Sequence, residues 1–596
     1  MPTYRAPVRD VRFILDDVLG VDRYANMSAF SEAPKDVRDA ILEETAKFCE
    51  NEVQPLNRVG DIHGCTLADD GSVTTPPGYK DAYDKFVAAG FMGLAADPDY
   101  GGQGLPNVLK SALNEMASSA CMAFAMYPGL TLGAASALAV GGTDEQKQTY
   151  LPKMLAGEWG GTMNLTEPQA GTDLGLLKTK AVPQADGSYA ITGQKIWISS
   201  GEHDLTDNII HLVLARIEGA PEGTKGISLF VVPKVFVNED GSLGERNAVR
   251  CGGLEEKMGI HGNATCVMNY DGATGWLVGE EHKGLRIMFV MMNEARIGTG
   301  LQGLSQSEVA YQNAVVWARE RLQGRSLTGP KNPDGAADPI IVHPDVRRML
   351  MDIKSFNEGA RAFGLWLALF SDLEHQSPDE EVRQKASDYL ALLTPVLKAY
   401  FTGRGFENVS NAVQVHGGSG YVEETGVAQF LRDSRIAMIY EGANGVQALD
   451  LVGRKLAMNG GRPLMTFLAE LDAFIAERED KEEVAEFVAG LKAARGHLQE
   501  ATDWLMNNAL ENFDHAGATS MDYLMLFGDV CLAYLWAQMA EAAQAKIAAG
   551  EGDPYFKTKL ATGRYFVART LPETATFLAK IKTGAGPVMA LDAEDF

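Results

Sequence analysis

A carboxylate and a glycine cluster stand close together between residues 411 and 455, NAVQVHGGSGYVEETGVAQFLRDSRIAMIYEGANGVQALDLVGRK. The carboxylate is Glu441, in the sequence IYEG. Burial among apolar neighbours raises the pKa of a carboxylate and lets it act as a base. Glycines such as Gly417 and Gly418 let backbone N–H groups approach phosphate oxygens. The combination indicates a proton-abstraction site near a redox cofactor that carries phosphate.

The four residues IYEG alone leave two interpretations of Glu441 open. In the first, Glu441 is a base that removes a proton from carbon. In the second, it is an ordinary carboxylate near a helix N-terminus, where the helix dipole favours negative charge. The surrounding elements and motifs must decide between them.

The elements that would position this segment form four predicted domains, because 596 residues exceed what one hydrophobic core supports. Residues 1–160 have a helical pattern, with Pro34 opening a helix that we expect Pro55 to end. Residues 107–141 are rich in Ala, Met and Leu and predict a buried helix pair.

The pattern changes near residue 160. Short β-branched runs separated by Gly, Asp and Pro predict a central β-barrel or β-sandwich over residues 161–280. Helical spacing returns over 281–458, a predicted bundle that contains Glu441. After the break at 459–461, Pro463 starts a C-terminal helical extension over 459–596. The predicted fold class is therefore α+β with several domains.

Composition excludes several classes of protein. Hydrophobic residues make up 46% and charged residues 22% of the chain, as in ordinary globular proteins. A net charge of -26 without a basic stripe argues against a nucleic-acid partner. The six cysteines show no CxxC or zinc spacing, which indicates buried free thiols, no metal site and a reducing compartment. We expect no membrane span, no signal peptide and a cytoplasmic location.

Three segments carry a resemblance to a known family. They are MNLTEPQAGTDLGLLK (163–178), QKIWISSG (194–201) and the segment around Glu441. Together with DPDYGG (97–102) and EKMGI (256–260), they resemble the acyl-CoA dehydrogenase family of flavoproteins, in order and spacing, over residues 30–455.

The resemblance implies FAD as cofactor and α,β-dehydrogenation of an acyl-CoA thioester. Glu441 would take the α-proton while the β-hydride passes to flavin N5. The Glu441 backbone N–H would stabilise negative charge on the thioester oxygen. The implied flavin-ring contacts are Met163, Leu165, Thr166, Trp197, Ile198 and Ser199. The implied substrate contacts are Thr172, Arg296, Tyr440 and Gly442.

The implied pyrophosphate contacts are Arg321, Gln414, Gly417 and Gly418, with Arg321 reaching the flavin of a neighbouring subunit. A solvated helix charge is the alternative for Arg321, core packing is the alternative for Trp197, and turn stabilisation is the alternative for Thr172. The sequence departs from the family pattern at RLQGR (321–325), which lacks the usual aromatic residue, and at Ala443 and Gly445.

The extension after residue 461 resembles that of long bacterial members of the family, which implies a homodimer. For this subgroup the resemblance implies 3-(methylthio)propionyl-CoA as substrate, in the demethylation route of dimethylsulfoniopropionate, and electron-transfer flavoprotein as electron acceptor. Three alternatives stay open: a medium- or long-chain fatty acyl-CoA dehydrogenase, an acyl-CoA oxidase, and a flavoprotein associated with nucleic acid. Acidic runs such as EREDKEE (477–483) argue against the last.

Overall fold

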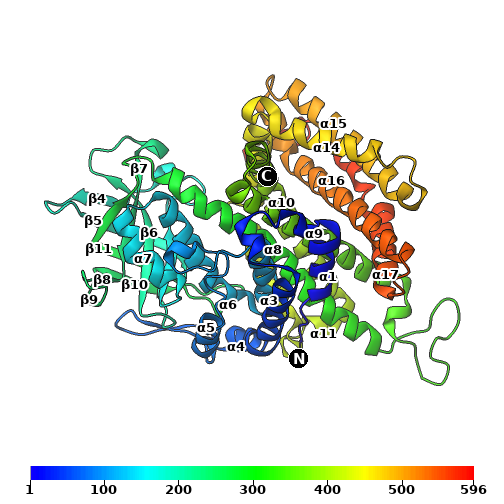
Figure 1. Ribbon diagram of the computed structural model, residues 1–596, viewed down its shortest axis with the longest axis horizontal. Helices are drawn as coiled ribbons and strands as arrows, with labels where there is room; N and C mark the ends of the chain where they lie inside the picture. Colours follow the sequence, from blue (N-terminus) through cyan, green and yellow to red (C-terminus); the bar gives the residue numbers. More distant parts are fainter. Residues whose placement is uncertain (1) are drawn as a thin grey trace. The chain divides into compact units, whose positions relative to one another are not determined.

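The computed structural model describes residues 2–596, and the chain divides into two compact units (Figure 1). One unit comprises Met1–Glu43 and Thr299–Phe596, and the other comprises Glu44–Gly298. The helices α3 (Lys35–Phe48) and α8 (Gly284–Glu320) carry the chain from one unit to the other. The N-terminal segment and the C-terminal extension therefore belong to the same unit.

The helical path that begins with α3 continues past Pro55, so the expectation that this proline ends the helix is wrong. A π-helical turn over Cys49–Val53 follows α3, and α4 (Gln54–His63) then begins with Pro55 in its first turn. First-turn N–H groups have no partner inside a helix, so the missing N–H of a proline costs little there. The wide turn resets the hydrogen-bond register just ahead of the proline.

Three further helices of the Glu44–Gly298 unit precede the strands of the barrel. They are α5 (Tyr79–Ala88), α6 (Asn107–Gly141) and α7 (Asp144–Leu155). The helix pair expected over 107–141 is α6, which Cys121 divides with non-helical dihedrals of φ −158° and ψ 99°. Thr143 caps α7, because its hydroxyl accepts the Gln146 N–H at 3.2 Å.

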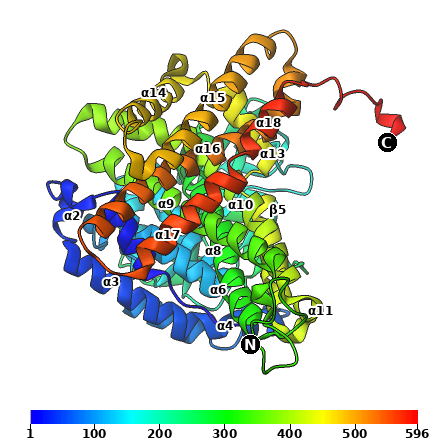
Figure 2. The ribbon, with the colours of Figure 1, turned by 90° about the vertical axis from the view of Figure 1, so that its right-hand side faces the viewer.

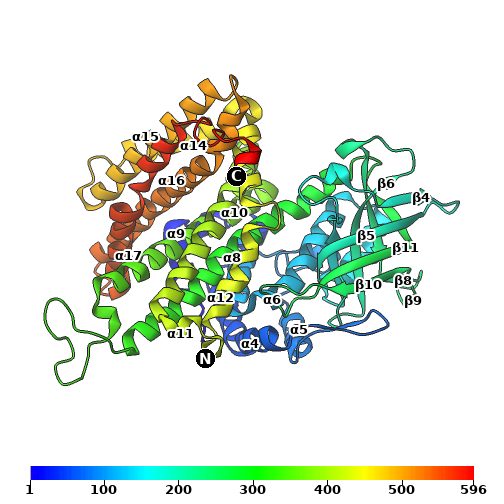
Figure 3. The same ribbon diagram turned by 180° about the vertical axis from the view of Figure 1, so that it is seen from behind.

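The central β region is a closed barrel and not a β-sandwich, the other form that the sequence allowed. Its strands are β3 (Trp159–Asn164), β4 (Lys180–Pro183), β5 (Tyr189–Ser199), β6 (Asn208–Ile217), β7 (Ile227–Pro233), β10 (Val249–Leu254) and β11 (Thr265–Val278). Pairing runs β11–β5–β4–β6–β7 and returns from β7 to β11. Strands β4, β5, β6, β10 and β11 of this sheet are labelled in Figure 3. A ring closed in this way has no free edges, while β10 and β3 extend it on either side.

Two short hairpins accompany the barrel. They are β1 (Thr66–Leu67) with β2 (Val73–Thr74), and β8 (Val235–Val237) with β9 (Leu243–Arg246). The β-branched runs at 190–191 and 196–198 lie on one strand, β5.

Alternation along β6 explains why nearly the whole strand is buried. Ile210, Leu212 and Leu214 pack with apolar residues of α6 and α7 on the outside of the barrel. Val213 and Ala215 point the other way, into the barrel core with Ile191 and other residues. A strand covered on both faces is apolar throughout, as the sequence of β6 is.

The other unit is a helical bundle. After α1 (Val8–Arg12) and α2 (Ser28–Ser31), its helices are the second part of α8, α9 (Pro344–Gln376), α10 (Glu380–His416), α11 (Gly418–Tyr421), α12 (Val427–Ser434) and α13 (Asn444–Asp450). The extension adds α14 (Arg462–Ala476), α15 (Ala485–Asn508), α16 (Phe513–Ala548), α17 (Pro554–Tyr565) and α18 (Glu573–Ile581). Pro463 lies in the first turn of α14, which confirms that it starts the extension, and the apolar residues Phe467 and Leu471 of this helix are buried. The predicted α+β class is confirmed as well.

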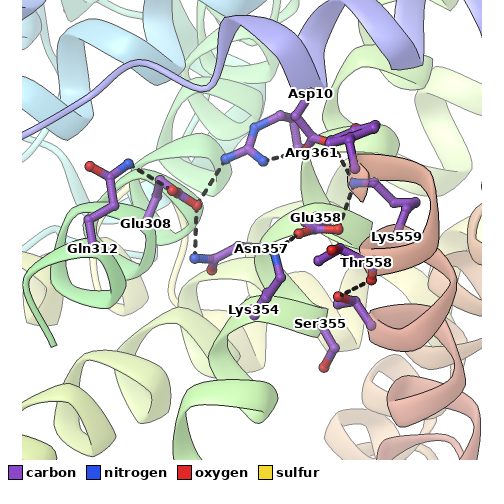
Figure 4. Close-up of polar contacts among 12 residues, drawn as sticks. Asp10, Glu308, Gln312, Lys354, Ser355, Asn357, Glu358, Arg361, Thr558 and Lys559 are labelled. Atoms are coloured by element: carbon purple, nitrogen blue, oxygen red, sulfur yellow. Dashed lines mark hydrogen bonds and ion pairs between the residues drawn. The ribbon is translucent and has the colours of Figure 1, made fainter. Parts of the chain in front are cut away.

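A buried charge network joins the two ends of the chain within this unit (Figure 4). Arg361 donates to Asp10 at 2.6 Å and to Glu308 at 3.0 Å. Lys559 of α17 donates to Asp10 and, at 2.6 Å, to Glu358. Burial alone would raise the pKa of Asp10, but Lys559 and Arg361 hold it well below its usual range. The extension is thus fixed to the N-terminal segment by paired charges.

Two helices, α6 and α16, are long and apolar enough to cross a membrane by length and composition. Their most apolar windows are 61% and 89% buried inside the protein, as in core helices of soluble proteins. The six cysteines are free thiols, as their spacing predicts, and all but Cys65 are buried.

Candidate active site

Glu441 lies in a short loop between a helical turn over Arg435–Met438 and α13. Glu441 and Gly442 both have left-handed backbones, with φ +57° and +82°. A left-handed conformation costs a non-glycine residue about 1–2 kcal/mol, and such strain concentrates at functional sites. A Cβ at position 442 would also lie 2.5 Å from Gln447 Nε2, so glycine is required there. The sequence therefore places a strained carboxylate beside an obligatory glycine.

The neighbours of Glu441 hold the loop from both sides. The side chain of Glu441 is half-buried. Tyr440, which precedes it, donates its hydroxyl to Gln302 of α8, and burial followed by the Glu441 charge raises the pKa of Tyr440 well above its usual value. Gln447 donates to the carbonyl oxygens of Glu441 and Gly442, each at 3.3 Å. Tyr440, Glu441 and Gly442 thus form one ordered segment.

The six residues expected at the flavin ring lie on two adjacent segments of the barrel unit. Met163 belongs to β3, and Leu165 and Thr166 follow it. The Ile196 N–H donates to the Thr166 carbonyl at 3.0 Å, and the Thr162 hydroxyl donates to the Ser199 carbonyl at 2.7 Å. These bonds bring residues 163–166 beside residues 197–199.

Trp197 is exposed in spite of its place in a strand of the barrel. Its backbone is left-handed at φ +59°, and 60% of its surface is accessible. Ile198, in contrast, is buried in the barrel core. The irregular backbone therefore turns a large aromatic surface outwards, which argues against the core-packing alternative for Trp197.

A buried ion pair that the sequence reasoning missed holds these two segments together. Lys195 Nζ lies 2.8 Å from Glu167 Oε1 and donates to the Leu165 carbonyl at 2.9 Å. Burial would raise the pKa of Glu167, but Lys195 and hydrogen bonds from Thr179 and the Lys178 amide lower it to about 2. Both residues stand inside the quoted motifs, and a lysine in a strand of a buried barrel was the available signal, because buried lysines are paired.

The residues expected at the pyrophosphate lie at one end of the helical bundle. Trp317 of α8 stacks on His416 of α10, with ring centroids 5.4 Å apart, and burial lowers the pKa of His416. The stack brings the end of α8, where Arg321 follows, beside the end of α10, where Gln414, Gly417 and Gly418 lie. Arg321, Gln414, Gly417 and Gly418 are all exposed.

These residues fit a bound dinucleotide. A Cβ at Gly417 or Gly418 would stand in open space, and Gly417 has φ +61°, so both backbones are accessible to a ligand. Arg321 offers an exposed guanidinium, which suits a pyrophosphate. Trp197 offers an exposed aromatic face for a planar ring. An exposed guanidinium and open glycine backbones suit a pyrophosphate, and an exposed aromatic face suits a flavin ring.

The loop after Arg321 is fixed by Asp338, which sequence reasoning did not single out. Its buried carboxylate accepts the N–H groups of Ser326 at 2.8 Å and Asn332 at 2.7 Å, and it lies 3.3 Å from Arg325. These backbone bonds lower the pKa of Asp338 to about 2. Arg325 therefore has a structural partner in Asp338.

Thr172 and Arg296 occupy other positions in the barrel unit. Thr172 is exposed in the loop after Glu167, and the next residue, Asp173, lines a cavity of about 420 Å³ together with Arg216. Arg296, in α8, is half-buried, donates to Asn293 at 3.2 Å and lies over the ring of Phe289.

Four family models match successive parts of the chain. They describe the N-terminal domain of acyl-CoA dehydrogenase over residues 35–158, the middle domain over 162–273 and the C-terminal domain over 282–456. The fourth, described as acetyl-CoA dehydrogenase C-terminal like, covers residues 467–592.

Full-length relatives agree with these matches. The chain is 44% identical to 3-methylmercaptopropionyl-CoA dehydrogenase of Ruegeria pomeroyi, over 97% of this chain and 98% of the relative. It is 35% identical to a broad-specificity linear acyl-CoA dehydrogenase of Mycobacterium tuberculosis, over 100% of both chains. The fold matches a Bacillus anthracis acyl-CoA dehydrogenase crystallised with FAD, with a TM-score of 0.75 and 22% identity over 92% of this chain and 89% of that one.

The order of elements, the strained Glu441 loop, the open glycines and the similarity along the whole chain lead to one conclusion. The protein belongs to the acyl-CoA dehydrogenase family and is an FAD-dependent oxidoreductase.

Proposed function

We propose that this enzyme converts 3-(methylthio)propionyl-CoA to 3-(methylthio)acryloyl-CoA, with Glu441 as the base. The half-buried Glu441 in its left-handed backbone is the observation that carries the proposed role of this residue. The 44% identity with the Ruegeria pomeroyi relative, over nearly the whole of both chains, supports the substrate.

Glu441 takes the proton from the α-carbon of the thioester. An α-C–H beside a thioester is weakly acidic, so the reaction needs a positioned base, and such a base contributes about 10²–10⁴-fold to the rate. FAD, when bound, accepts the β-hydride, so that the substrate loses two hydrogens and gains a Cα=Cβ bond. Tyr440 and Gly442, which flank Glu441, line the same loop and contact the thioester.

Residues 163–166 and 197–199 hold the flavin ring. Trp197 supplies its exposed aromatic surface, and the hydroxyls of Thr166 and Ser199 supply hydrogen bonds. Met163, Leu165 and Ile198 complete the apolar part of this surface. The Lys195–Glu167 pair fixes the spacing of the two segments.

Arg321, Gln414, Gly417 and Gly418 hold the pyrophosphate. Because Arg321 is exposed at the end of α8, it is available to a cofactor bound mainly by a second copy of the chain. In this arrangement the enzyme is a homodimer, and Arg321→Ala weakens FAD binding without unfolding the protein. Thr172 contacts the CoA arm, and Arg296 is a second contact of the substrate.

A broad-range linear acyl-CoA dehydrogenase is the second candidate. The 35% identity with the Mycobacterium tuberculosis relative, over the whole of both chains, favours it. The two candidates share the base and the cofactor and differ in the pocket for the acyl chain. Electron-transfer flavoprotein is the proposed acceptor, and the free buried thiols support a cytoplasmic location.

A panel of acyl-CoA substrates separates the candidates. Flavin bleaching and steady-state constants would be measured with butyryl-, octanoyl-, palmitoyl- and 3-(methylthio)propionyl-CoA. The proposal expects the sulfur substrate to have the highest kcat/KM. A tenfold or larger preference for palmitoyl-CoA, about 1.4 kcal/mol of transition-state stabilisation, would contradict it.

A further inference from the structure

Lys398 is a fully buried lysine on α10 that contacts the Glu441 loop. Its ammonium donates to the carbonyl oxygen of Gly442 at 2.9 Å and to Asn444 Oδ1 at 3.0 Å. Gly442 directly follows Glu441, and Asn444 is the first residue of α13. The Lys398 side chain therefore contacts both ends of the short connection between Glu441 and α13.

Asn444 is held by α10 through a second set of bonds. Thr402 donates its hydroxyl to Asn444 Oδ1 at 3.0 Å, and Asn444 Nδ2 donates to the Ala399 carbonyl at 3.2 Å. Asn444 and Thr402 are both buried. Helices α10 and α13 lie side by side (Figure 2). The amide of Asn444 thus uses its acceptor and its donor to fix the start of α13 against one turn of α10.

The backbone of the loop needs such support. Glu441 and Gly442 are consecutive left-handed residues. Glu441 pays a conformational penalty there, and a strained residue keeps its conformation only when the surrounding structure imposes it. Lys398 and Gln447 together donate three hydrogen bonds to the carbonyl oxygens of Glu441 and Gly442. These hydrogen bonds hold the left-handed backbone of Glu441 and Gly442 in place.

Burying an ammonium group to donate a hydrogen bond to a carbonyl oxygen has a high free-energy cost. Taking a charge out of water costs several kcal/mol, and apolar residues of similar volume are often as stabilising as buried charges. A hydrogen bond from a charged donor is stronger than one from a neutral donor, and it fixes its acceptor more tightly. This property suits the positioning of a catalytic loop.

We infer that Lys398 is a positioning residue of the dehydrogenation, which sets the place of the Glu441 carboxylate through Gly442 and Asn444. The inference rests on the proposed role of Glu441 as the base. A misplacement of about 1 Å in a reacting group costs on the order of 10²-fold in rate. Lys398 therefore acts on the proton-abstraction step through its bonds to Gly442 and Asn444.

Lys398→Met removes the donor and keeps the length of the side chain. We expect the purified holoenzyme to retain its flavin, its KM to stay within about twofold, and kcat per bound flavin to fall roughly 100-fold. With α-deuterated acyl-CoA the isotope effect on kcat rises, because proton abstraction becomes rate-limiting. A merely structural role would lower the amount of folded enzyme and leave both the rate per flavin and the isotope effect unchanged.

Lys559→Met is the matched control, because Lys559 is an equally buried lysine of the same unit that contacts Asp10 and Glu358 instead of the loop. It should lower the melting temperature and keep the wild-type rate per flavin. Thr402→Val is a milder change that preserves shape and removes the hydroxyl that contacts Asn444 Oδ1 and the Lys398 carbonyl. We expect it to lower kcat per flavin about five- to tenfold, with the same rise in isotope effect.

The outcomes separate this inference from the proposed function. If Glu441→Gln keeps its turnover, the assignment of the base fails. If Glu441→Gln is inactive while Lys398→Met has wild-type kcat per flavin and isotope effect, the positioning role alone is overturned. If Lys398→Met does not fold, Thr402→Val decides, and an unchanged rate and isotope effect in that variant would overturn the inference.

Discussion

Lys195 and Glu167 form a buried ion pair at 2.8 Å that joins the two segments expected to hold the flavin ring. The same ammonium donates to the carbonyl oxygen of Leu165, so it connects β5 to the chain that follows β3. Both motifs that identify the family therefore depend on a contact that lies beneath the proposed cofactor surface.

Removing one partner of this pair should destabilise the barrel unit. Glu167→Gln leaves the Lys195 ammonium buried without its counter-charge, and such losses cost about 3–5 kcal/mol. We expect a clear fall in the melting temperature and weaker FAD retention. The double variant Glu167→Gln/Lys195→Met should recover part of the loss. Equal stability of the wild type and Glu167→Gln in differential scanning calorimetry would rule out this role.

Trp197→Ala should weaken FAD binding and leave the fold intact. The side chain is 60% exposed, so its removal opens no cavity in the core. We expect the FAD dissociation constant to rise tenfold or more, as measured by fluorescence titration of the apoprotein. Leu243→Ala, another exposed apolar residue of the same unit, is the control and should keep wild-type affinity. Unchanged affinity in Trp197→Ala would remove Trp197 from the ring site.

Arg321→Ala should lower FAD affinity by roughly tenfold, because a charge-assisted contact to pyrophosphate contributes about 1.5 kcal/mol or more. Arg319→Ala is a close control, since Arg319 is also exposed and lies two residues earlier on α8. Light scattering of both variants with and without FAD tests the proposed homodimer. Equal FAD affinity in the two variants would show that Arg321 is a solvated helix charge.

Asp529 should make the stability of the helical unit depend on pH. Burial raises its pKa to about 7, although Arg404, 3.7 Å away, and the Tyr400 hydroxyl, at 2.6 Å, both favour the charged form. A carboxyl whose pKa is raised on folding stabilises the fold while it is protonated. This contribution is complete below pH 3.8 and is lost as the pH rises through 7.

The Asp529→Asn variant tests that titration. It imitates the protonated form, so it should lose less stability than the wild type as the pH rises from about 4 to 7. The test is to measure the melting temperatures of both proteins between about pH 4 and pH 7. Parallel curves for the two proteins would show that Asp529 does not titrate there.

Sequence reasoning was accurate where a pattern is local. The β-branched runs gave the barrel strands, and Pro463 marked the start of α14. It failed at Pro55, because a π-helical turn places that proline in a first turn instead of a helix interior. It also could not choose between sandwich and barrel, since closure depends on the pairing of β7 with both β6 and β11.

The supporting charges of the site lay beyond sequence reasoning for a different reason. Lys398 precedes Gly442 by 44 positions and Lys559 follows Asp10 by 549, so no periodicity connects either pair. A lysine in an apolar helix stretch or strand indicates that some partner exists. Only the fold shows that the partner of Lys398 is the loop of the proposed base. The predicted flavin-ring residues lie close together on the barrel unit, and the predicted pyrophosphate residues lie close together on the helical bundle. The roles of these residues stay predictions.

The central claim is that Glu441 removes the α-proton. The most direct measurement is anaerobic stopped-flow bleaching of the flavin by 3-(methylthio)propionyl-CoA in Glu441→Gln and wild type, each with full FAD content. The account predicts that Glu441→Gln binds the thioester normally and that its flavin is reduced at least 10²-fold more slowly. Flavin reduction in Glu441→Gln at a rate within a few-fold of the wild type would contradict it.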